Sequence, residues 1–196
     1  GHIGTPLTSN ATKVLLLGSG ELGKQLAMSF QNLGLEVHAV DSYAGAPAHQ
    51  VAQYSYVADI KDAGRILQLA REIQPHFVVP EVETVAVEAL EEMEAQSDAI
   101  VVPSARACAM TQDRQCVREV AENIGLPVSA YRFASSLEEL EEAVGELGFP
   151  CIIKPDVSTS GKGHMIARDE DDVRVAWETV RRVSSDSQRV VAERFV

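Results

Sequence analysis

Residues 13–23 read KVLLLGSGELG, and this stretch decides the fold of the chain. The aliphatic run at 13–17 predicts a short buried strand, and the glycines after it form a Gly-X-Gly-X-X-Gly turn. Apolar side chains then recur at helical spacing, at Leu22, Leu26, Phe30 and Leu33. Gly34 ends this helix, and a second strand at 36–40 stops at Asp41. Together these segments predict a βαβ unit at the start of a parallel sheet.

The alternation of strands and helices continues after this unit. Helices are predicted over 63–73 and 85–95, and strands over 76–79 and 99–102. Such spacing favours a parallel sheet with helices on both faces, in which ligands bind beyond the carboxyl ends of the strands. Four acidic residues are expected at that edge, namely Glu21, Asp41, Glu81 and Glu83. We interpret Glu83 as a cap of the following helix and the other three as candidate ligand contacts.

A second glycine-rich stretch, residues 154–164, reads KPDVSTSGKGH. It joins predicted strands at 151–154 and 164–167 and so forms the tip of a hairpin. Glycines let backbone N–H groups approach an anion, while Lys154 and Lys162 supply positive charge. The pattern differs from a Walker A loop because Lys162 precedes a glycine rather than Ser or Thr. It predicts a loop that covers phosphates, and the alternative is a surface hairpin with solvated lysines.

The second half of the chain also predicts three helices and a last strand at 189–193. The first helix, at 113–124, is expected to turn Val117, Val120, Ala121 and Ile124 inward. Ser136 and Glu139 form a capping box for the second helix, whose glutamates are interpreted as a solvated face. The third helix, at 169–183, is expected to bury Val173, Ala176, Trp177 and Val180. A domain boundary is placed near Thr111, where the regular alternation ends.

Composition excludes several classes of function. Among 196 residues, 17 are basic and 29 are acidic, and a net charge of −12 argues against binding nucleic acid or an anionic membrane. Cys108, Cys116 and Cys151 lack metal-site spacing and are expected to be buried thiols of a reducing cytoplasm. We see neither a membrane-spanning run nor a secretory signal, and residues 1–11 are expected to be a flexible terminus that begins with a tag remnant.

The first turn leaves an alternative open. With Asp41 after the second strand, it satisfies the dinucleotide fingerprint, so an NAD-binding Rossmann oxidoreductase is a rival interpretation. Two features count against it. Glu21 lies inside the turn, where it would repel a pyrophosphate but suit an amine, and a second phosphate-type loop follows at 161–163.

The motifs occur in the order found in ATP-grasp enzymes. More narrowly, LLGSGELGK at 16–24 and PCIIKP at 150–155 resemble the formate-dependent phosphoribosylglycinamide formyltransferase family, and the resemblance runs from about residue 12 to 196. It implies an α/β fold: a Rossmann-like parallel-sheet pre-ATP-grasp domain at 12–111, followed by the α+β amino-terminal part of an ATP-grasp domain at 112–196.

The resemblance also implies roles for individual residues. Glu21, Leu22 and Glu81 match positions that hold glycinamide ribonucleotide, and Arg114 and Lys154 match positions that contact ATP phosphates. The remaining ATP contacts implied are Thr159, Ser160, Gly161, Lys162, Gly163 and His164 of the loop and Glu193, Arg194, Phe195 and Val196 of the hinge that reads adenine. The family commonly has an amide residue where this chain has His164.

In that family, formate attacks the γ-phosphate of MgATP to give formyl phosphate, and the substrate amine then displaces phosphate. The Mg²⁺ ligands and catalytic groups are expected beyond Val196, so the chain, which we take as a fragment, is not expected to react alone. The resemblance further implies a cytoplasmic homodimer whose partners are small molecules. Rivals within the superfamily are carboxyaminoimidazole ribonucleotide synthetase and biotin carboxylase; a third interpretation is a stand-alone nucleotide-binding module.

Overall fold

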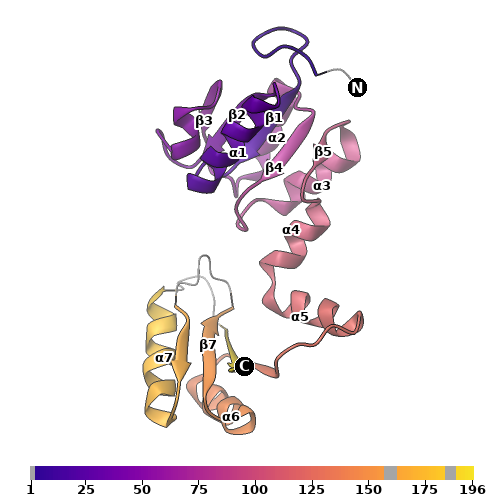
Figure 1. Cartoon of the computed structure of the whole chain (residues 1–196). Coiled ribbons are helices and arrows are strands. Elements are labelled where there is room, and N and C mark those ends of the chain that lie inside the picture. The colour runs from indigo at the N-terminus through magenta and orange to yellow at the C-terminus, as the bar shows by residue number, and fades with distance from the viewer. Residues whose placement is uncertain (1–2, 157–162, 184–188) are drawn as a thin grey trace. The chain divides into compact units, whose positions relative to one another are not determined.

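The structure is a computed structural model that describes residues 3–156, 163–183 and 189–196. The chain divides into two compact units, Gly1–Gln112 and Asp113–Val196 (Figure 1). Within the described residues, no helix is both long enough and apolar enough to cross a membrane.

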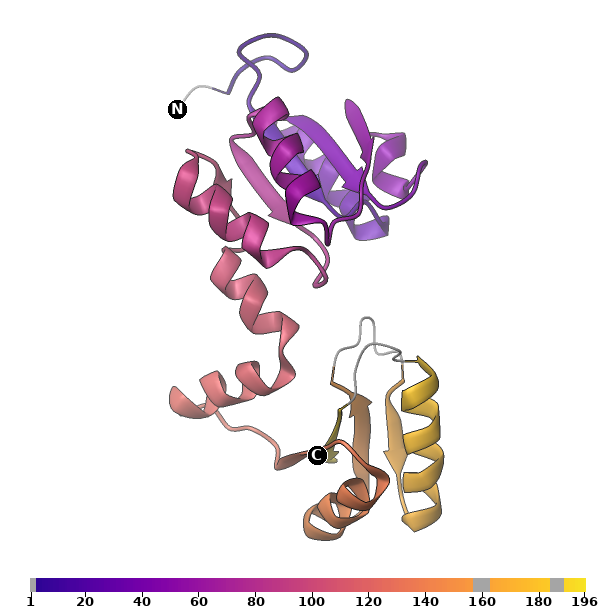
Figure 2. The same ribbon diagram turned by 180° about the vertical axis from the view of Figure 1, so that it is seen from behind.

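The first unit is a five-stranded parallel sheet in the order β3-β2-β1-β4-β5, with helices on both faces (Figures 1 and 2). Its strands are β1 (Lys13–Leu17), β2 (Glu36–Asp41), β3 (Tyr54–Val57), β4 (Phe77–Pro80) and β5 (Ile100–Val101). Its helices are α1 (Glu21–Asn32), the 3-10 helix η1 (Pro47–Gln50), α2 (Ala63–Ile73), α3 (Val87–Gln96) and α4 (Ala105–Gln112). The predicted parallel α/β architecture is confirmed, while η1, β3 and α4 were not predicted.

The central strand β1 supplies the core on both faces of this sheet. Leu15 and Leu17 pack in the cluster that includes residues of α2 and α3, whereas Leu16 packs with α1 and η1. All three leucines are fully buried. Since burying one leucine contributes about 1.5–3 kcal/mol, this short strand is a main source of stability for the unit.

The predicted inward face of α1 is only partly correct. Leu22 and Leu33 are 59% and 63% exposed, and the fully buried positions of the helix are Gly23 and Ala27. Small residues let α1 approach the sheet closely: a Cβ atom at position 23 would lie 2.8 Å from the carbonyl oxygen of Gly18. Close approach of the backbone therefore decides which face of α1 is buried, rather than the count of large apolar side chains.

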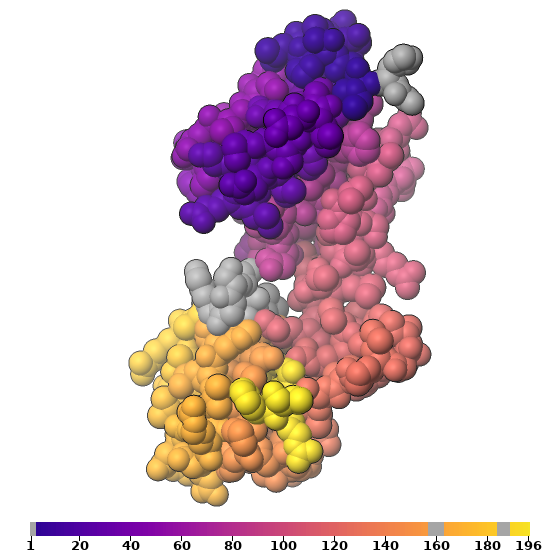
Figure 3. Space-filling view, viewed as in Figure 1, coloured from indigo at the N-terminus to yellow at the C-terminus, as the bar shows by residue number. Residues whose placement is uncertain are grey.

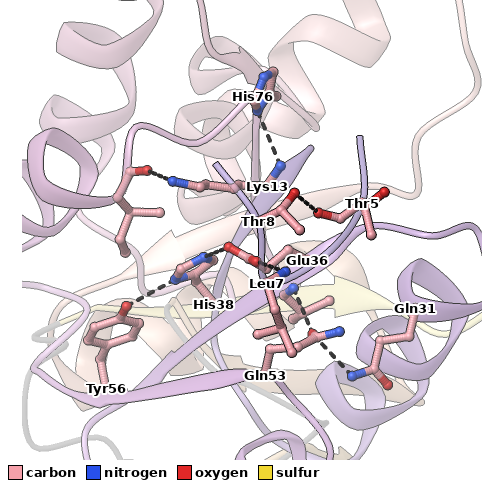
Figure 4. A network of polar contacts seen from close by, with 12 residues as sticks. Thr5, Leu7, Thr8, Lys13, Gln31, Glu36, His38, Gln53, Tyr56 and His76 are labelled. Carbon is pink, nitrogen blue, oxygen red and sulfur yellow. Dashed lines mark hydrogen bonds and ion pairs between the residues drawn. The ribbon is translucent and has the colours of Figure 1, made fainter. Parts of the chain in front are cut away.

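A buried polar network lies in the same unit, toward the amino ends of the strands (Figure 4). The carboxylate of Glu36 accepts a 2.6 Å hydrogen bond from the backbone N–H of Leu7 and lies 2.8 Å from Nε2 of His38. The other ring nitrogen of His38 lies 2.9 Å from the hydroxyl of Tyr56. Burial lowers the pKa of His38 despite the neighbouring carboxylate. The network ties the segment at Leu7 to strand β2.

The second unit is a four-stranded antiparallel sheet in the order β6-β9-β7-β8. Its elements are α5 (Arg114–Asn123), β6 (Tyr131–Ala134), α6 (Leu137–Leu147), β7 (Cys151–Pro155), β8 (Met165–Ala167), α7 (Glu170–Val183) and β9 (Val190–Arg194). Helices α6 and α7 cover one face of the sheet. The predicted hairpin of β7 and β8 is confirmed, and β6 was not predicted.

Local sequence signals account for α6 and α7. The Oγ atom of Ser136 accepts a 3.1 Å hydrogen bond from the N–H of Glu139, as the capping box predicted. The carboxylate of Glu139 reaches one residue further back than expected, to the N–H of Ser135 at 2.7 Å. On α7, Trp177 is buried in the core of the unit, as predicted.

Two predictions for this half of the chain are wrong. No residue of α5 is buried, and Val117 and Ile124, which were expected to point inward, are exposed. Helix α5 instead contacts the sheet through Arg118, which is described below. Cys116 is only half-buried, whereas Cys108 and Cys151 are buried as expected; all three thiols are free.

Candidate functional site

The first candidate site lies at the carboxyl ends of β1 and β4. The N–H of Gly18, just after β1, donates to the carbonyl oxygen of Val40 at 3.0 Å, and the N–H of Glu81, just after β4, donates to that of Leu17 at 2.8 Å. Gly18 has φ +102°, and a Cβ atom there would lie 2.7 Å from Oε2 of Glu81. The glycine therefore allows the turn and the Glu81 carboxylate to lie against each other.

The Glu81 carboxylate is in an unusual electrostatic environment. Burial raises its pKa, and the charges of Asp41 and Glu83 raise it further. Its Oε2 atom is buried and makes no hydrogen bond within the described part of the chain. A carboxylate in this condition suits a ligand that brings positive charge and N–H donors, such as a primary amine.

Asp41 holds the glycine turn in place. Its Oδ2 accepts a 2.8 Å hydrogen bond from the N–H of Ser19, and its Oδ1 accepts a 2.7 Å hydrogen bond from the N–H of Ser42. Ser19 is fully buried, and its hydroxyl donates to the carbonyl oxygen of Val40 at 2.9 Å. Because both oxygens of Asp41 already bind backbone groups, this residue is poorly disposed to take the ribose hydroxyls of a dinucleotide, which counts against the NAD interpretation.

The other candidates of this unit lie where α1 begins. Glu21 is in the first turn of α1, where the helix dipole favours a carboxylate, and Leu22 is exposed beside it. The interpretation of Glu83 as a helix cap is wrong, because the N-cap of α3 is Ala86 and no side chain caps that helix.

The second candidate site lies on the face of the antiparallel sheet that α6 and α7 leave uncovered. Alternation along β7 and β9 turns Ile153 and Ala192 into the core and places Lys154 and Glu193 on the opposite face. The Oε2 atom of Glu193 accepts hydrogen bonds from Nζ of Lys154 at 2.9 Å and from Nη2 of Arg118 at 2.5 Å. Burial acts to raise the pKa of Glu193, but these two cations outweigh it and the pKa is lowered.

Further charged groups lie within electrostatic reach of this pair. Burial lowers the pKa of His164, the positive charges of Arg114 and Lys154 lower it further, and Glu193 acts in the opposite direction. The second unit therefore places His164 within electrostatic reach of Arg114, Lys154 and Glu193, which lie on α5, β7 and β9.

The remaining predicted contacts are placed only in part. Thr159, Ser160, Gly161 and Lys162 lie outside the described residues, and Gly163 is described with φ +77°. At the end of β9, the N–H of Arg194 donates to the carbonyl oxygen of Ala130 at 2.9 Å and that of Phe195 to Pro150 at 3.3 Å. Val196 is exposed, and this end of the chain, coloured yellow, lies at the surface of the unit (Figure 3).

Sequence reasoning missed Arg118, although a signal was available. It follows Arg114 by four residues on a helix, so both side chains project from one face of α5. As for metals, no group of three or more His, Cys, Asp or Glu that could hold an ion is found among the residues described.

Each of the two units matches a family model of known proteins. A family model described as the ribonucleotide synthetase preATP-grasp domain matches residues 11–112, and an ATP-grasp domain model matches residues 119–196. The chain is 50% identical over 196 residues to a formate-dependent phosphoribosylglycinamide formyltransferase of Corynebacterium glutamicum strain R, covering 99% of this chain and 48% of the relative.

Two solved structures are similar as well. Glycinamide-RNase-transformylase T from Mycobacterium tuberculosis is 35% identical with a TM-score of 0.72, and the match covers 94% of this chain and 48% of the transformylase chain. A carboxyaminoimidazole ribonucleotide synthase of Aspergillus clavatus, complexed with ATP, is 26% identical with a TM-score of 0.83. This match covers 94% of this chain and 47% of the synthase chain.

The match to the curated relatives runs along this whole chain but not along theirs. The chain spans about half the length of the curated relatives it matches: it covers 48% of the relative from Corynebacterium glutamicum and 49% of the one from Rhodococcus jostii. Because the first family model matches residues 11–112 and the second matches residues 119–196, the chain belongs to the ribonucleotide synthetase preATP-grasp domain family and continues into an ATP-grasp domain.

Proposed function

We propose that the protein containing this chain formylates the amine of glycinamide ribonucleotide with formate and ATP. The observation that carries the proposal is the Glu81 carboxylate, whose raised pKa and unpartnered oxygen, within the described residues, suit a primary amine. The name shared by relatives from Corynebacterium glutamicum and Rhodococcus jostii, at 50% and 49% identity, supports the same activity.

Each unit has its own part in this proposal. Residues 12–111 hold the ribonucleotide, with Glu21, Leu22 and Glu81 around its amine. Residues 112–196 hold the nucleotide, with Arg114 and Lys154 at the phosphates. The loop residues Thr159, Ser160, Gly161, Lys162, Gly163 and His164 cover the phosphates, and Glu193, Arg194, Phe195 and Val196 face the adenine.

In the proposed reaction an oxygen of formate attacks the γ-phosphorus of ATP and ADP leaves. The amine nitrogen then attacks the formyl carbon, and inorganic phosphate leaves. Phosphoryl transfer depends mainly on positioning and charge neutralisation, which a site of lysine, arginine and backbone N–H groups can supply. Mg²⁺ is part of this proposal, but the described residues offer no ligand group for it, so we derive no step through the metal.

The nearest rival is a carboxyaminoimidazole ribonucleotide synthetase. Solved structures of that class reach TM-scores up to 0.83, but their sequence identities of 21–27% are below the 35% of the transformylase from Mycobacterium tuberculosis. Backbone similarity is shared across ATP-grasp enzymes, so the higher sequence identity over the aligned chain favours the formyltransferase. We also propose that the full-length protein is a cytoplasmic homodimer.

The test is ADP release by the full-length protein. We expect turnover that requires both formate and glycinamide ribonucleotide. Glu81→Gln is expected to weaken ribonucleotide binding by at least about tenfold, because it removes a charge-assisted hydrogen bond. Glu91→Gln, a change at an exposed glutamate of α3, is the matched control. Turnover driven by bicarbonate and independent of formate would refute the proposal.

A further inference from the structure

We propose that Arg118 is a positioning residue of the nucleotide site: it holds the Glu193 carboxylate permanently, so that Lys154 can leave Glu193 and contact the phosphates. This inference rests on the proposed function, because it assumes that Lys154 and Glu193 face a nucleotide. None of the motifs that carried the sequence-based prediction includes Arg118.

Arg118 joins three elements of the second unit. Its Nη2 donates to Oε2 of Glu193 on β9 at 2.5 Å, and its Nη1 donates to the carbonyl oxygen of Arg114 on α5 at 2.9 Å. Its guanidinium carbon lies 5.2 Å from the centroid of the Tyr131 ring on β6. The side chain is only 13% exposed. A planar guanidinium held on three sides has little freedom to follow a ligand, so Arg118 is suited to a fixed role.

Lys154 is placed differently. Its described ion pair joins it to the same oxygen, Oε2 of Glu193, at 2.9 Å. A lysine ammonium is a point charge on a flexible four-carbon stem and can reorient at small cost. Of the two cations that share Glu193, lysine is therefore the one able to turn toward a phosphate when a nucleotide arrives.

Without Arg118 that movement would be costly. The side chain of Glu193 is 18% exposed, and removing one partner of a largely buried ion pair leaves an uncompensated charge. If Lys154 were the only partner, its departure toward the phosphates would strand the Glu193 carboxylate. Because Arg118 remains, the carboxylate stays neutralised and keeps its orientation on β9 while Lys154 moves.

A matched control exists in the same unit. Arg132 on β6 pairs with Glu146 on α6 at 2.9 Å, but the two side chains are 56% and 54% exposed. Exposed ion pairs of this kind contribute little to stability or orientation. Arg132→Met therefore removes the same type of charge from the same unit without removing a partner of Glu193.

The experiment compares Arg118→Met, Arg118→Lys and Arg132→Met with the wild type. ATP affinity is measured by calorimetry in the full-length protein, and the carboxyl carbon of Glu193 is followed by NMR against pH in the 196-residue chain. For Arg118→Met we expect ATP affinity to fall at least about tenfold and Glu193 to titrate at higher pH, because a neighbouring cation favours the ionised form. Arg118→Lys should recover part of both effects, and Arg132→Met should change neither.

A double variant separates positioning from a general loss of charge. If Arg118 acts through Glu193, adding Arg118→Met to Glu193→Gln should cost no further ATP affinity. Additive losses, or an Arg118→Met variant within twofold of wild-type affinity, would overturn the inference. If the wild type itself binds no ATP, the proposed function fails. If Arg118→Met leaves the titration of Glu193 unchanged, the proposed interaction of Arg118 with that carboxylate is refuted separately.

Discussion

Replacing Gly18 by alanine tests the geometry of the first site directly. Gly18 has φ +102°, which alanine adopts only under strain, and the new Cβ atom would lie 2.7 Å from Oε2 of Glu81 and 3.0 Å from a methyl carbon of Val82. Gly20, in the same turn, is the matched control, because a Cβ atom there meets nothing within 4 Å.

The expected magnitude follows from these two positions. The strained backbone of Gly18→Ala costs about 1–3 kcal/mol, and displacement of the Glu81 side chain adds to it. At roughly 4 °C for each kcal/mol, the melting temperature of the first unit should fall by about 4–12 °C. For Gly20→Ala, loss of a favourable N-cap glycine and gain from a stiffer unfolded chain offset each other within about 1 kcal/mol.

The assay is thermal unfolding with two signals. Far-UV circular dichroism follows the whole chain, whereas fluorescence of Trp177, the single tryptophan, follows the second unit. Gly18→Ala should lower the circular dichroism transition and leave the fluorescence transition in place. A Gly18→Ala variant as stable as Gly20→Ala would refute the close approach between the turn and Glu81.

Three further predictions concern charge, capping and thiols. Burial and neighbouring carboxylates raise the pKa of Glu81 in the folded chain, so the stability that the protonated group contributes at low pH is lost as pH rises through that pKa. Glu81→Gln should therefore raise the free energy of unfolding at pH 7, measured in urea. A lower free energy of unfolding would contradict this. Ser136→Ala should cost about 1 kcal/mol through loss of the cap of α6, seen as an earlier fluorescence transition in urea, and an unchanged midpoint would argue against the cap. Burial raises the pKa of the Cys108 and Cys151 thiols, so iodoacetamide should label the half-buried Cys116 first. Peptide mapping that finds Cys151 labelled first would contradict this.

The elements that could be predicted are those whose signals are local. Strand β1, the glycine turn and α2 follow from hydrophobic period and glycine placement, and the hairpin of β7 and β8 follows from two apolar runs around a glycine-rich loop. Strands β3 and β6 were missed, and both lie at an edge of their sheet. An edge strand has only one strand neighbour and buries fewer side chains, so its sequence carries a weaker pattern.

By itself, the sequence determined the parallel α/β architecture, the glycine turn and the residue types that can bind an amine or a phosphate. Only the tertiary structure decided which of these groups meet. Arg118 reaches Glu193 across 75 residues of sequence, and the turn at Gly18 lies against Glu81 because β1 and β4 are neighbours in the sheet. The physical reason is that strand order and register set such distances, whereas hydrophobic periodicity reports only which face of each segment is buried.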